Sequence, residues 1–179
     1  MSSARITTFA FSGIDAVPVE VQVQLSTGLP NFVLVGMADK AVGEADGLLT
    51  LVPHDPYFNE LKGQILLESG RPKEALPVLR DAVQRTNYQP LIAAMFGHAL
   101  IATEDKANYP EAERVLRNAV ARDNENPFAW YQLGTIYAQE GDTARAALAS
   151  AERFDLIGQP PQALYNAKIA MAGIPKGSS

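Results

Sequence analysis

Small residues recur along this chain at intervals of 34 residues. Gly63 and Gly97 are separated by this distance, and so are Ala112 and Ala146. Such a period is typical of a helix–turn–helix unit that repeats along the chain and buries its apolar face against its neighbours. The period therefore predicts a mainly α-helical array of antiparallel helix pairs, in which small residues mark the points where two helices cross closely.

One insertion reconciles the remaining intervals with this period. The interval from Gly97 to Gly134 is 37 residues, and the interval from Ala75 to Ala112 is 37 as well. Both excesses disappear if three residues are inserted between the two helices of the middle unit. The loop 103–109 is the segment in which we expect them.

The third unit departs from the pattern in its second helix. The first two units carry Leu79 and Leu116 at one position of this helix, and the third unit has Ser150 there. Arg153 likewise stands where the other two units have alanine. We therefore expect the helices of the third unit to pack differently from those of the first two.

Prolines and apolar stripes predict where each helix begins and ends. A proline in the first turn costs little, because the first N–H groups of a helix have no intrahelical partner. The expected helices span 39–52, 57–69, 72–86, 89–103, 110–122, 126–140, 143–156 and 160–172. The predicted array 39–174 comprises a half repeat 39–55, repeats at about 56–88, 89–125 and 126–158, and the final helix; 175–179 is an expected frayed tail.

Residues 1–38 have a different pattern, which predicts a small β segment of about three strands. Apolar residues alternate with polar ones over 17–25, and 32–35 is a short continuous apolar run. The first pattern is typical of a half-buried strand and the second of a covered strand. Gly13 and the segment 28–31 are the expected turns. A sheet this small is marginal alone, so self-association through these strands is one expected way to cover it.

Composition excludes several classes of partner and compartment. The net charge is −5 without a basic run, so we expect neither nucleic acid nor an anionic membrane as a partner. There is no cysteine, and we expect no cofactor or metal. The N-terminus lacks the pattern of a signal peptide, and no apolar stretch would span a bilayer. These features predict a cytoplasmic protein without membrane insertion.

The run Trp130, Leu133, Gly134 and Tyr137 has the spacing W-x-x-L-G-x-x-Y, and Ala146 follows it. These residues resemble the tetratricopeptide repeat (TPR), a scaffold for binding proteins. The resemblance implies a solenoid fold, with Trp130 and Tyr137 in the core. It also implies that one face of each first helix lines a concave groove, which would take an extended segment or a helix of a partner.

The residues at groove-facing positions are the candidate binding site. They are Tyr57, Glu60, Gln64, Glu68, His98, Ile101, Phe128, Tyr131, Thr135 and Gln139. Tyr131 would be an aromatic anchor, whereas His98 is either a ligand contact or a packed or solvated side chain. Glu60 and Gln64 stand where some TPR proteins hold a C-terminal carboxylate with basic residues, so such a ligand is not expected.

Residues 1–44 are similar to the start of the magnesium-chelatase-like AAA+ ATPases of the competence-associated branch. The similar segments are A-R at 4–5, G-I-D-A at 13–16, V-E-V at 19–21, G-L-P-N-F at 28–32 and V-G-M-A-D-K-A-V at 35–42. In that family they open an α/β domain of the Lon-protease-like fold. The family's Arg-rich helix and further strands do not follow Glu44, and no phosphate-binding loop G-x-x-x-x-G-K-[ST] occurs. We therefore expect no ATPase activity.

Residues 45–179 resemble the C-terminal TPR region of bacterial zinc metalloproteases that are exported to the cell envelope. The similar segments are E-A-D-G-L-L at 44–49, P-H-D-P-Y at 53–57, E-L-K-G-Q at 60–64, E-A-L-P at 74–77, R-F-D at 153–155 and A-K at 167–168. The catalytic half of that family carries H-E-x-x-H, and neither His54 nor His98 lies in such a motif. We therefore expect no protease activity.

The two resemblances meet near residues 42–45, and each covers only a fragment of its parent family. We therefore interpret the chain as a chimera and expect a non-enzymatic TPR module that binds a protein or peptide in its groove. Two alternatives stay open. The chain is either a detached, non-catalytic fragment of a zinc metalloprotease, or an inert chimeric product that folds without a partner.

Overall fold

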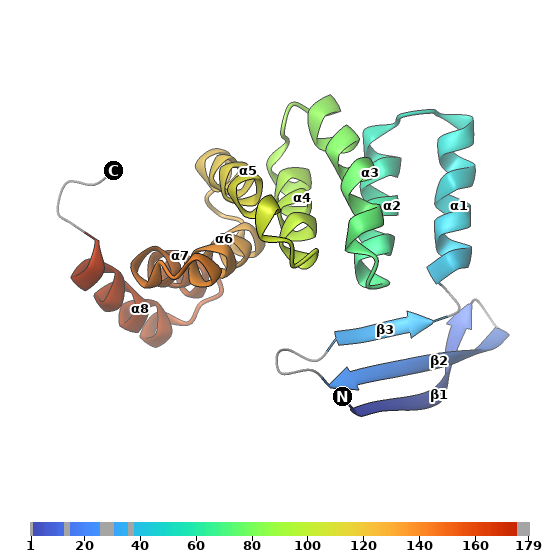
Figure 1. Ribbon diagram of the computed structural model, residues 1–179, viewed down its shortest axis with the longest axis horizontal. Coiled ribbons are helices and arrows are strands. Elements are labelled where there is room, and N and C mark those ends of the chain that lie inside the picture. The colour runs from blue at the N-terminus through green and yellow to red at the C-terminus, as the bar shows by residue number, and fades with distance from the viewer. Residues whose placement is uncertain (1, 13–14, 26–30, 36–37, 175–179) are drawn as a thin grey trace. The chain divides into compact units, whose positions relative to one another are not determined.

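The computed structural model describes residues 2–12, 15–25, 31–35 and 38–174, with side chains from residue 39 onward (Figure 1). The chain divides into two compact units, Met1–Ala82 and Val83–Ser179. The described part is mainly helical, with eight α-helices after the strands. The predicted turn residues Gly13 and 28–30 and the predicted tail 175–179 lie outside the described residues.

The first unit opens with three strands, β1 (Ser2–Ser12), β2 (Asp15–Leu25) and β3 (Asn31–Val35). They form an antiparallel sheet in the order β1-β2-β3. In its register, Val21 of β2 is opposite Ile6 on one side and Leu34 on the other. The central strand is therefore the one with the alternating apolar pattern.

Three helices follow in sequence: α1 (Ala38–Leu51), α2 (Pro56–Glu68) and α3 (Pro72–Arg85), the last of which continues into the second unit. The Asp55 side chain caps α2, because its Oδ1 accepts hydrogen bonds from the backbone N–H groups of Tyr57 at 2.9 Å and Phe58 at 3.0 Å. Pro56 follows it at the first helical position, where a missing N–H costs little. The start of this helix thus follows from local sequence alone.

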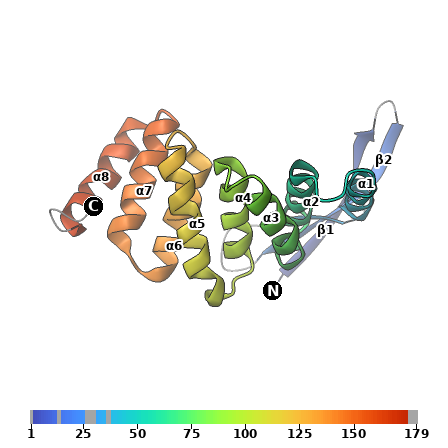
Figure 2. The same ribbon diagram turned by 90° about the horizontal axis from the view of Figure 1, so that it is seen from above.

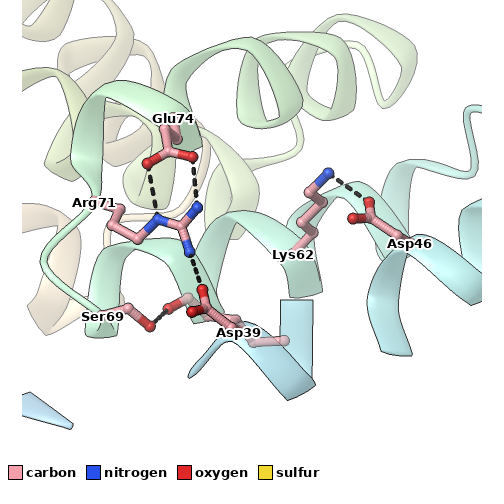
Figure 3. A network of polar contacts seen from close by, with 7 residues as sticks. Asp39, Asp46, Lys62, Ser69, Arg71 and Glu74 are labelled. Atoms are coloured by element: carbon pink, nitrogen blue, oxygen red, sulfur yellow. Dashed lines mark hydrogen bonds and ion pairs between the residues drawn. The ribbon is translucent and has the colours of Figure 1, made fainter. Parts of the chain in front are cut away.

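Charged side chains connect α1 to the following helix pair (Figure 3). The Arg71 guanidinium donates to both oxygens of Glu74, at 2.8 and 2.7 Å, and to Asp39 Oδ1 at 2.8 Å. The hydrogen bond from Arg71 holds the pKa of Glu74 below its usual range. Lys62 of α2 pairs with Asp46 of α1. These contacts hold α1 beside α2.

The second unit contains α4 (Pro90–Ala102), α5 (Tyr109–Arg122), α6 (Pro127–Glu140), α7 (Thr143–Leu156) and α8 (Pro160–Gly173). Helices adjacent in sequence lie side by side, α4 with α5, α6 with α7, and α7 with α8 (Figures 1 and 2). Their shared core contains fully buried Phe96, Leu100, Leu116 and Ile136. The helices begin within one residue of the starts predicted from proline and capping patterns.

The predicted insertion lies between α4 and α5. These helices are separated by residues 103–108, whereas 69–71 separate α2 from α3 and 141–142 separate α6 from α7. The longer connection forms a short 3-10 turn, Lys106–Asn108, capped by Asp105 Oδ1 at 3.0 Å from the Ala107 nitrogen. The additional residues therefore extend a surface turn without interrupting either helix.

The glycine crossings differ between the predicted repeats, as the sequence predicts. A Cβ atom at Gly63 would overlap the Leu79 side chain, and one at Gly97 would lie 2.5 Å from Leu116. A Cβ atom at Gly134 would instead meet Ala149 Cβ at 3.4 Å, an ordinary contact. Ser150 replaces leucine here, and its hydroxyl donates to the Ala146 carbonyl at 2.8 Å. The altered packing expected for this pair is confirmed.

Candidate functional site

The residues predicted to line a groove lie on the first helix of each predicted pair, and they are divided between the two units. Tyr57, Glu60, Gln64 and Glu68 are on α2 in the first unit. His98 and Ile101 are on α4, and Phe128, Tyr131, Thr135 and Gln139 are on α6, all in the second unit. Each unit therefore presents its own candidate surface.

The α2 surface is a stripe of polar and aromatic side chains at helical spacing. The Tyr57 side chain is exposed, and Gln64 Nε2 donates to Glu68 Oε1 at 2.8 Å, one turn further along. Glu60 lies between them and is half-buried, and this burial raises the pKa of its carboxyl. A partly desolvated carboxylate gains from a cationic partner, so this surface is suited to a basic side chain.

Aromatic rings bring two of the candidates in the second unit together. The rings of His98 on α4 and Phe128 on α6 meet edge to face, with centroids 5.7 Å apart. His98 Nδ1 is buried without a hydrogen-bond partner among the described residues. Phe128 remains 40 % exposed. The half-buried His98 side chain therefore packs against a partly exposed aromatic ring.

Ile101 does not belong to an open surface. Its side chain is 6 % exposed and forms part of the buried apolar set of α4. Buried residues occur on most sides of this helix, so neighbours cover most of its circumference rather than one stripe. The prediction that Ile101 contacts a ligand is wrong for this reason.

Tyr131 is a second partly exposed aromatic residue on α6. Its side chain is 40 % exposed, and the Arg153 guanidinium lies 5.0 Å from the ring centroid. Arg153 also lies 5.2 Å from the ring of Phe154. This cation–π arrangement restricts the Tyr131 ring from one side. In the sequence, Arg153 is noticeable because the other two repeats have alanine at this position. This difference does not by itself identify the ring that Arg153 contacts.

The two remaining α6 candidates differ in what they can offer. The Thr135 hydroxyl donates to the Tyr131 carbonyl at 2.9 Å, so its proton is used within the helix. Gln139 is exposed.

The predicted core residues of α6 also differ in burial. Tyr137 is buried at 7 % exposure, which confirms the core position predicted for it. Trp130 is half-buried, and its indole N–H donates to the Asn124 carbonyl at 2.8 Å.

The structure has a hollow on α5, the second helix of the middle repeat, that the sequence analysis does not predict. It is open to solvent, has a volume of about 550 Å³ and is lined by Asn87, Tyr88, Arg114, Val115, Asn118 and Arg122. In the sequence, the hollow is indicated by Arg114, Asn118 and Arg122, which follow one another four residues apart on one helix.

Among residues 38–174, no group of three or more His, Asp or Glu side chains is placed to hold a metal ion. No helix in the same range has the length and apolarity to cross a bilayer.

A family model described as tetratricopeptide repeat matches residues 36–90 and 101–163, more than half of the chain. The first matched range begins ahead of the join predicted at 42–45. No curated protein matches the sequence significantly.

Solved structures of TPR proteins resemble the fold. A double mutant of MamA from strain RS-1 is 25 % identical with a TM-score of 0.61, and the match covers 69 % of this chain and 68 % of the other. YrrB, described as a TPR protein with an unusual peptide-binding site, is 23 % identical with a TM-score of 0.62, covering 74 % and 66 %. A thermophilic TPR protein of Thermus thermophilus is 23 % identical with a TM-score of 0.52, covering 80 % and 86 %.

Proposed function

Because the chain belongs to the tetratricopeptide-repeat family, we propose that it is a non-enzymatic module that binds an extended segment or a helix of a partner protein on its first helices. Repeats of this kind stack helix pairs and leave one helix of each pair to form a binding surface. Arrays of such repeats generally form extended binding surfaces, which favours a scaffold over a catalyst. The partner is therefore expected to be a protein or peptide.

The observation that carries the proposal is the pair of exposed aromatic rings on α6. Phe128 and Tyr131 are each 40 % exposed although aromatic side chains are favoured in the core. Each ring is held from one side, Phe128 by His98 and Tyr131 by Arg153. A ring whose rotamer is already restricted loses little entropy on binding, which is characteristic of interface anchors.

The chemistry of the two candidate surfaces suggests what they would accept. The α6 surface would receive apolar or aromatic side chains of the ligand through Phe128 and Tyr131. The α2 surface would favour basic side chains, because Glu60 is partly desolvated and Glu68 adds a second carboxylate. The structurally similar YrrB has a peptide-binding site, and this supports a peptide ligand here by analogy of fold.

Selection of peptides on the purified chain would test this function. A random peptide library is selected against the immobilised protein, and the recovered peptides are synthesised and their dissociation constants measured by fluorescence anisotropy. For peptides that carry apolar or aromatic residues, which the α6 surface should receive, Tyr131→Ala should weaken binding about tenfold or more. A loss of this size is the effect of removing an interface anchor. For ligands that carry basic residues, Glu60→Lys should abolish binding through charge reversal.

Tyr165→Ala is the matched control, because Tyr165 is an exposed tyrosine on α8 outside the candidate surfaces. It should leave every dissociation constant within about twofold of the wild type. The proposal fails if no peptide is enriched, or if the selected peptides bind the Tyr131 and Glu60 variants as tightly as they bind this control.

The origin of the chain and its repeat boundaries form a separate part of the proposal. A chimera joined near residues 42–45, with a β segment 1–38 ahead of the array 39–174, accounts for the two partial resemblances. Sequencing a genomic amplicon across codons 40–48 tests it, since a join absent from genomic DNA would overturn a natural fusion. The protease-fragment alternative requires a separate catalytic chain, so it predicts zinc binding or proteolysis in material purified together with that chain. Calorimetry with added zinc and a casein assay would detect them.

A further inference from the structure

The hollow on α5, called here the arginine pocket, is lined mainly by side chains that can donate hydrogen bonds. Its lining residues are Asn87, Tyr88, Arg114, Val115, Asn118 and Arg122. Two guanidinium groups, two side-chain amides and one phenol surround it, and buried Val115 forms an apolar floor. None of its six lining residues carries a carboxylate. A donor-rich concavity of this kind favours a ligand with acceptor oxygens and negative charge.

Arg122 is held in a defined position at one side of the pocket. Its Nη1 donates to the carbonyl oxygen of Asn87 at 2.7 Å and also to that of Tyr88. Both acceptors are uncharged backbone groups, so these hydrogen bonds do not neutralise its charge. A guanidinium fixed by backbone carbonyls keeps its fork of N–H groups, and less conformational entropy is lost when an anion binds it.

The turn that fixes Arg122 has an uncommon backbone. Asn87 and Tyr88 have consecutive positive φ angles of 51° and 56°, a region that bulky residues such as tyrosine rarely adopt. This conformation directs both carbonyl groups to the same guanidinium. Residues held in such conformations concentrate at functional sites. The turn thus joins α3 to α4 and also accepts the hydrogen bonds of Arg122 beside the pocket.

A second hollow continues the pocket along α5. It is an open hollow of about 420 Å³ that shares Arg114 and Asn118 with the first and adds Arg117, Pro110 and Glu113. Two carboxylates compete for the arginines at this end, because Glu111 lies 3.6 Å from Arg114 and Glu113 lies 3.6 Å from Arg117. The nitrogen–oxygen distances of both ion pairs are long, and the two arginine side chains are about 60 % exposed. The guanidinium groups can therefore turn toward a ligand.

We propose that the arginine pocket binds oxyanion groups, carboxylate or phosphate, presented by an acidic segment of a polypeptide. Guanidinium forks recognise the paired oxygens of carboxylates and phosphates bidentately. Three arginines follow one helix over two adjoining hollows, which suits a chain with successive acidic side chains better than a single ion. The site uses none of the candidate residues on the first helices, so it is independent of the peptide-binding function of α2 and α6.

Three synthetic peptides with an uncharged fluorophore test the proposal by anisotropy with the full chain. One carries six glutamates, one carries phosphoserines at the same positions, and one carries glutamines. The glutamate or the phosphoserine peptide should bind, and raising the salt concentration should weaken binding. Stronger binding of one of the two identifies carboxylate or phosphate as the preferred source. Equal binding of the glutamine peptide, or no binding of either acidic peptide, would overturn the proposal.

Two variants of equal charge change separate this pocket from general electrostatics. Arg114→Gln should weaken the acidic peptide about tenfold or more, the loss expected for a charge-assisted hydrogen bond. Lys168→Gln, on exposed α8, removes the same charge and should have an effect of about twofold or less. Arg114 is an exposed side chain, so its variant is expected to fold. Equal losses in both variants would show that the peptide does not use the pocket.

Nuclear magnetic resonance gives a readout that does not depend on any variant. Titration of the acidic peptide into ¹⁵N-labelled protein should shift the side-chain amide signals of Asn87 and Asn118, which line the pocket. The side-chain amide of Gln139 on α6 serves as the reference and should stay unchanged. Shifts confined to other parts of the chain would overturn the assignment to this pocket.

Discussion

Individual glycines show how one missing side chain controls a helix crossing. Gly97 faces Leu116, which is fully buried, and an added Cβ would come within 2.5 Å of its side chain. Gly134 has the same place in the predicted repeat, yet Ser150 stands where leucine would have filled the space. The same residue type is therefore required by packing at one crossing and not at the other.

Alanine substitution at these two glycines should separate the effects. Gly97→Ala should lower the free energy of unfolding by about 1–3 kcal/mol through overpacking. Gly134→Ala should be neutral or stabilising by up to about 1 kcal/mol, because alanine favours helix and meets only ordinary contacts. Urea unfolding followed by the fluorescence of Trp130, the single tryptophan, measures both. Equal destabilisation by the two variants would contradict this account of the crossings.

Glu60 links a residue's burial to pH. Burial raises the pKa of its carboxyl, so the folded chain holds this proton more tightly than the unfolded chain does. The carboxyl therefore favours folding at low pH, and this contribution is lost as pH rises through the raised pKa. At neutral pH the ionised group is a net cost to the first unit.

Glu60→Gln should consequently stabilise α2 at about pH 7, by less than about 1 kcal/mol because the group keeps some solvent contact. The gain should vanish near pH 4, where the wild-type carboxyl is largely protonated. Opening free energies of α2 amides from hydrogen exchange, corrected for intrinsic rates, provide the measurement. A gain that is the same at both pH values would mean that ionisation is not its cause.

At the scale of the element, α6 shows how local sequence defines both ends of a helix. Asn126 Oδ1 accepts hydrogen bonds from the backbone N–H groups of Phe128 at 3.0 Å and Ala129 at 3.1 Å. At the other end Gly141 has a φ of 82°, which glycine adopts without steric cost, and the Asp142 N–H returns to the Tyr137 carbonyl at 2.9 Å. The two exposed aromatic residues Phe128 and Tyr131 lie on the helix so defined.

Removing the N-terminal cap of α6 should therefore cost stability. Asn126→Ala leaves two N–H groups without their side-chain acceptor and should destabilise the second unit by about 1 kcal/mol. Asn126→Ser keeps an acceptor oxygen and should retain most of the wild-type stability. Thermal unfolding monitored by Trp130 fluorescence compares the three proteins. The interpretation of Asn126 as a cap would be wrong if the serine and alanine variants were equally destabilised.

Local sequence was sufficient for the helices but not for every property of their surfaces. Proline and capping residues placed the helix starts within about a residue, and α3 continues through Pro77 as the predicted span 72–86 requires. Register within the repeat placed Tyr57, Phe128 and Tyr131 at exposed positions, where the structure has them. It failed for Ile101, because register alone does not tell how many neighbours cover a helix.

At the scale of the whole molecule, the helices of each compact unit contact mainly their neighbours in sequence, so stability should vary along the chain. In such arrays a local defect acts on its own pair and the next rather than on the entire molecule. Gly63 crosses Leu79 in the first unit, and Trp130 lies in the second. A substitution at Gly63 can therefore report how far a local defect spreads.

Gly63→Ala should speed amide exchange in α2 and α3 by about tenfold or more, as expected for a loss above about 1.4 kcal/mol. Exchange in α6 and α7 should change less. Mass spectrometry of peptides from these helices measures all four in one experiment. An equal increase in all of them would show that the chain unfolds as a single cooperative unit instead.

The sequence by itself determined the repeat, its insertion and its helix boundaries, because these depend on periodicity and on backbone preferences within a few residues. It also predicted the altered third crossing from the single replacement by Ser150. Only the tertiary structure decided that Ile101 is buried, that Arg153 stacks on Tyr131, and that Arg122 is fixed by the turn at Asn87 and Tyr88. Those properties depend on side chains from different helices, whose meeting no spacing along the chain specifies.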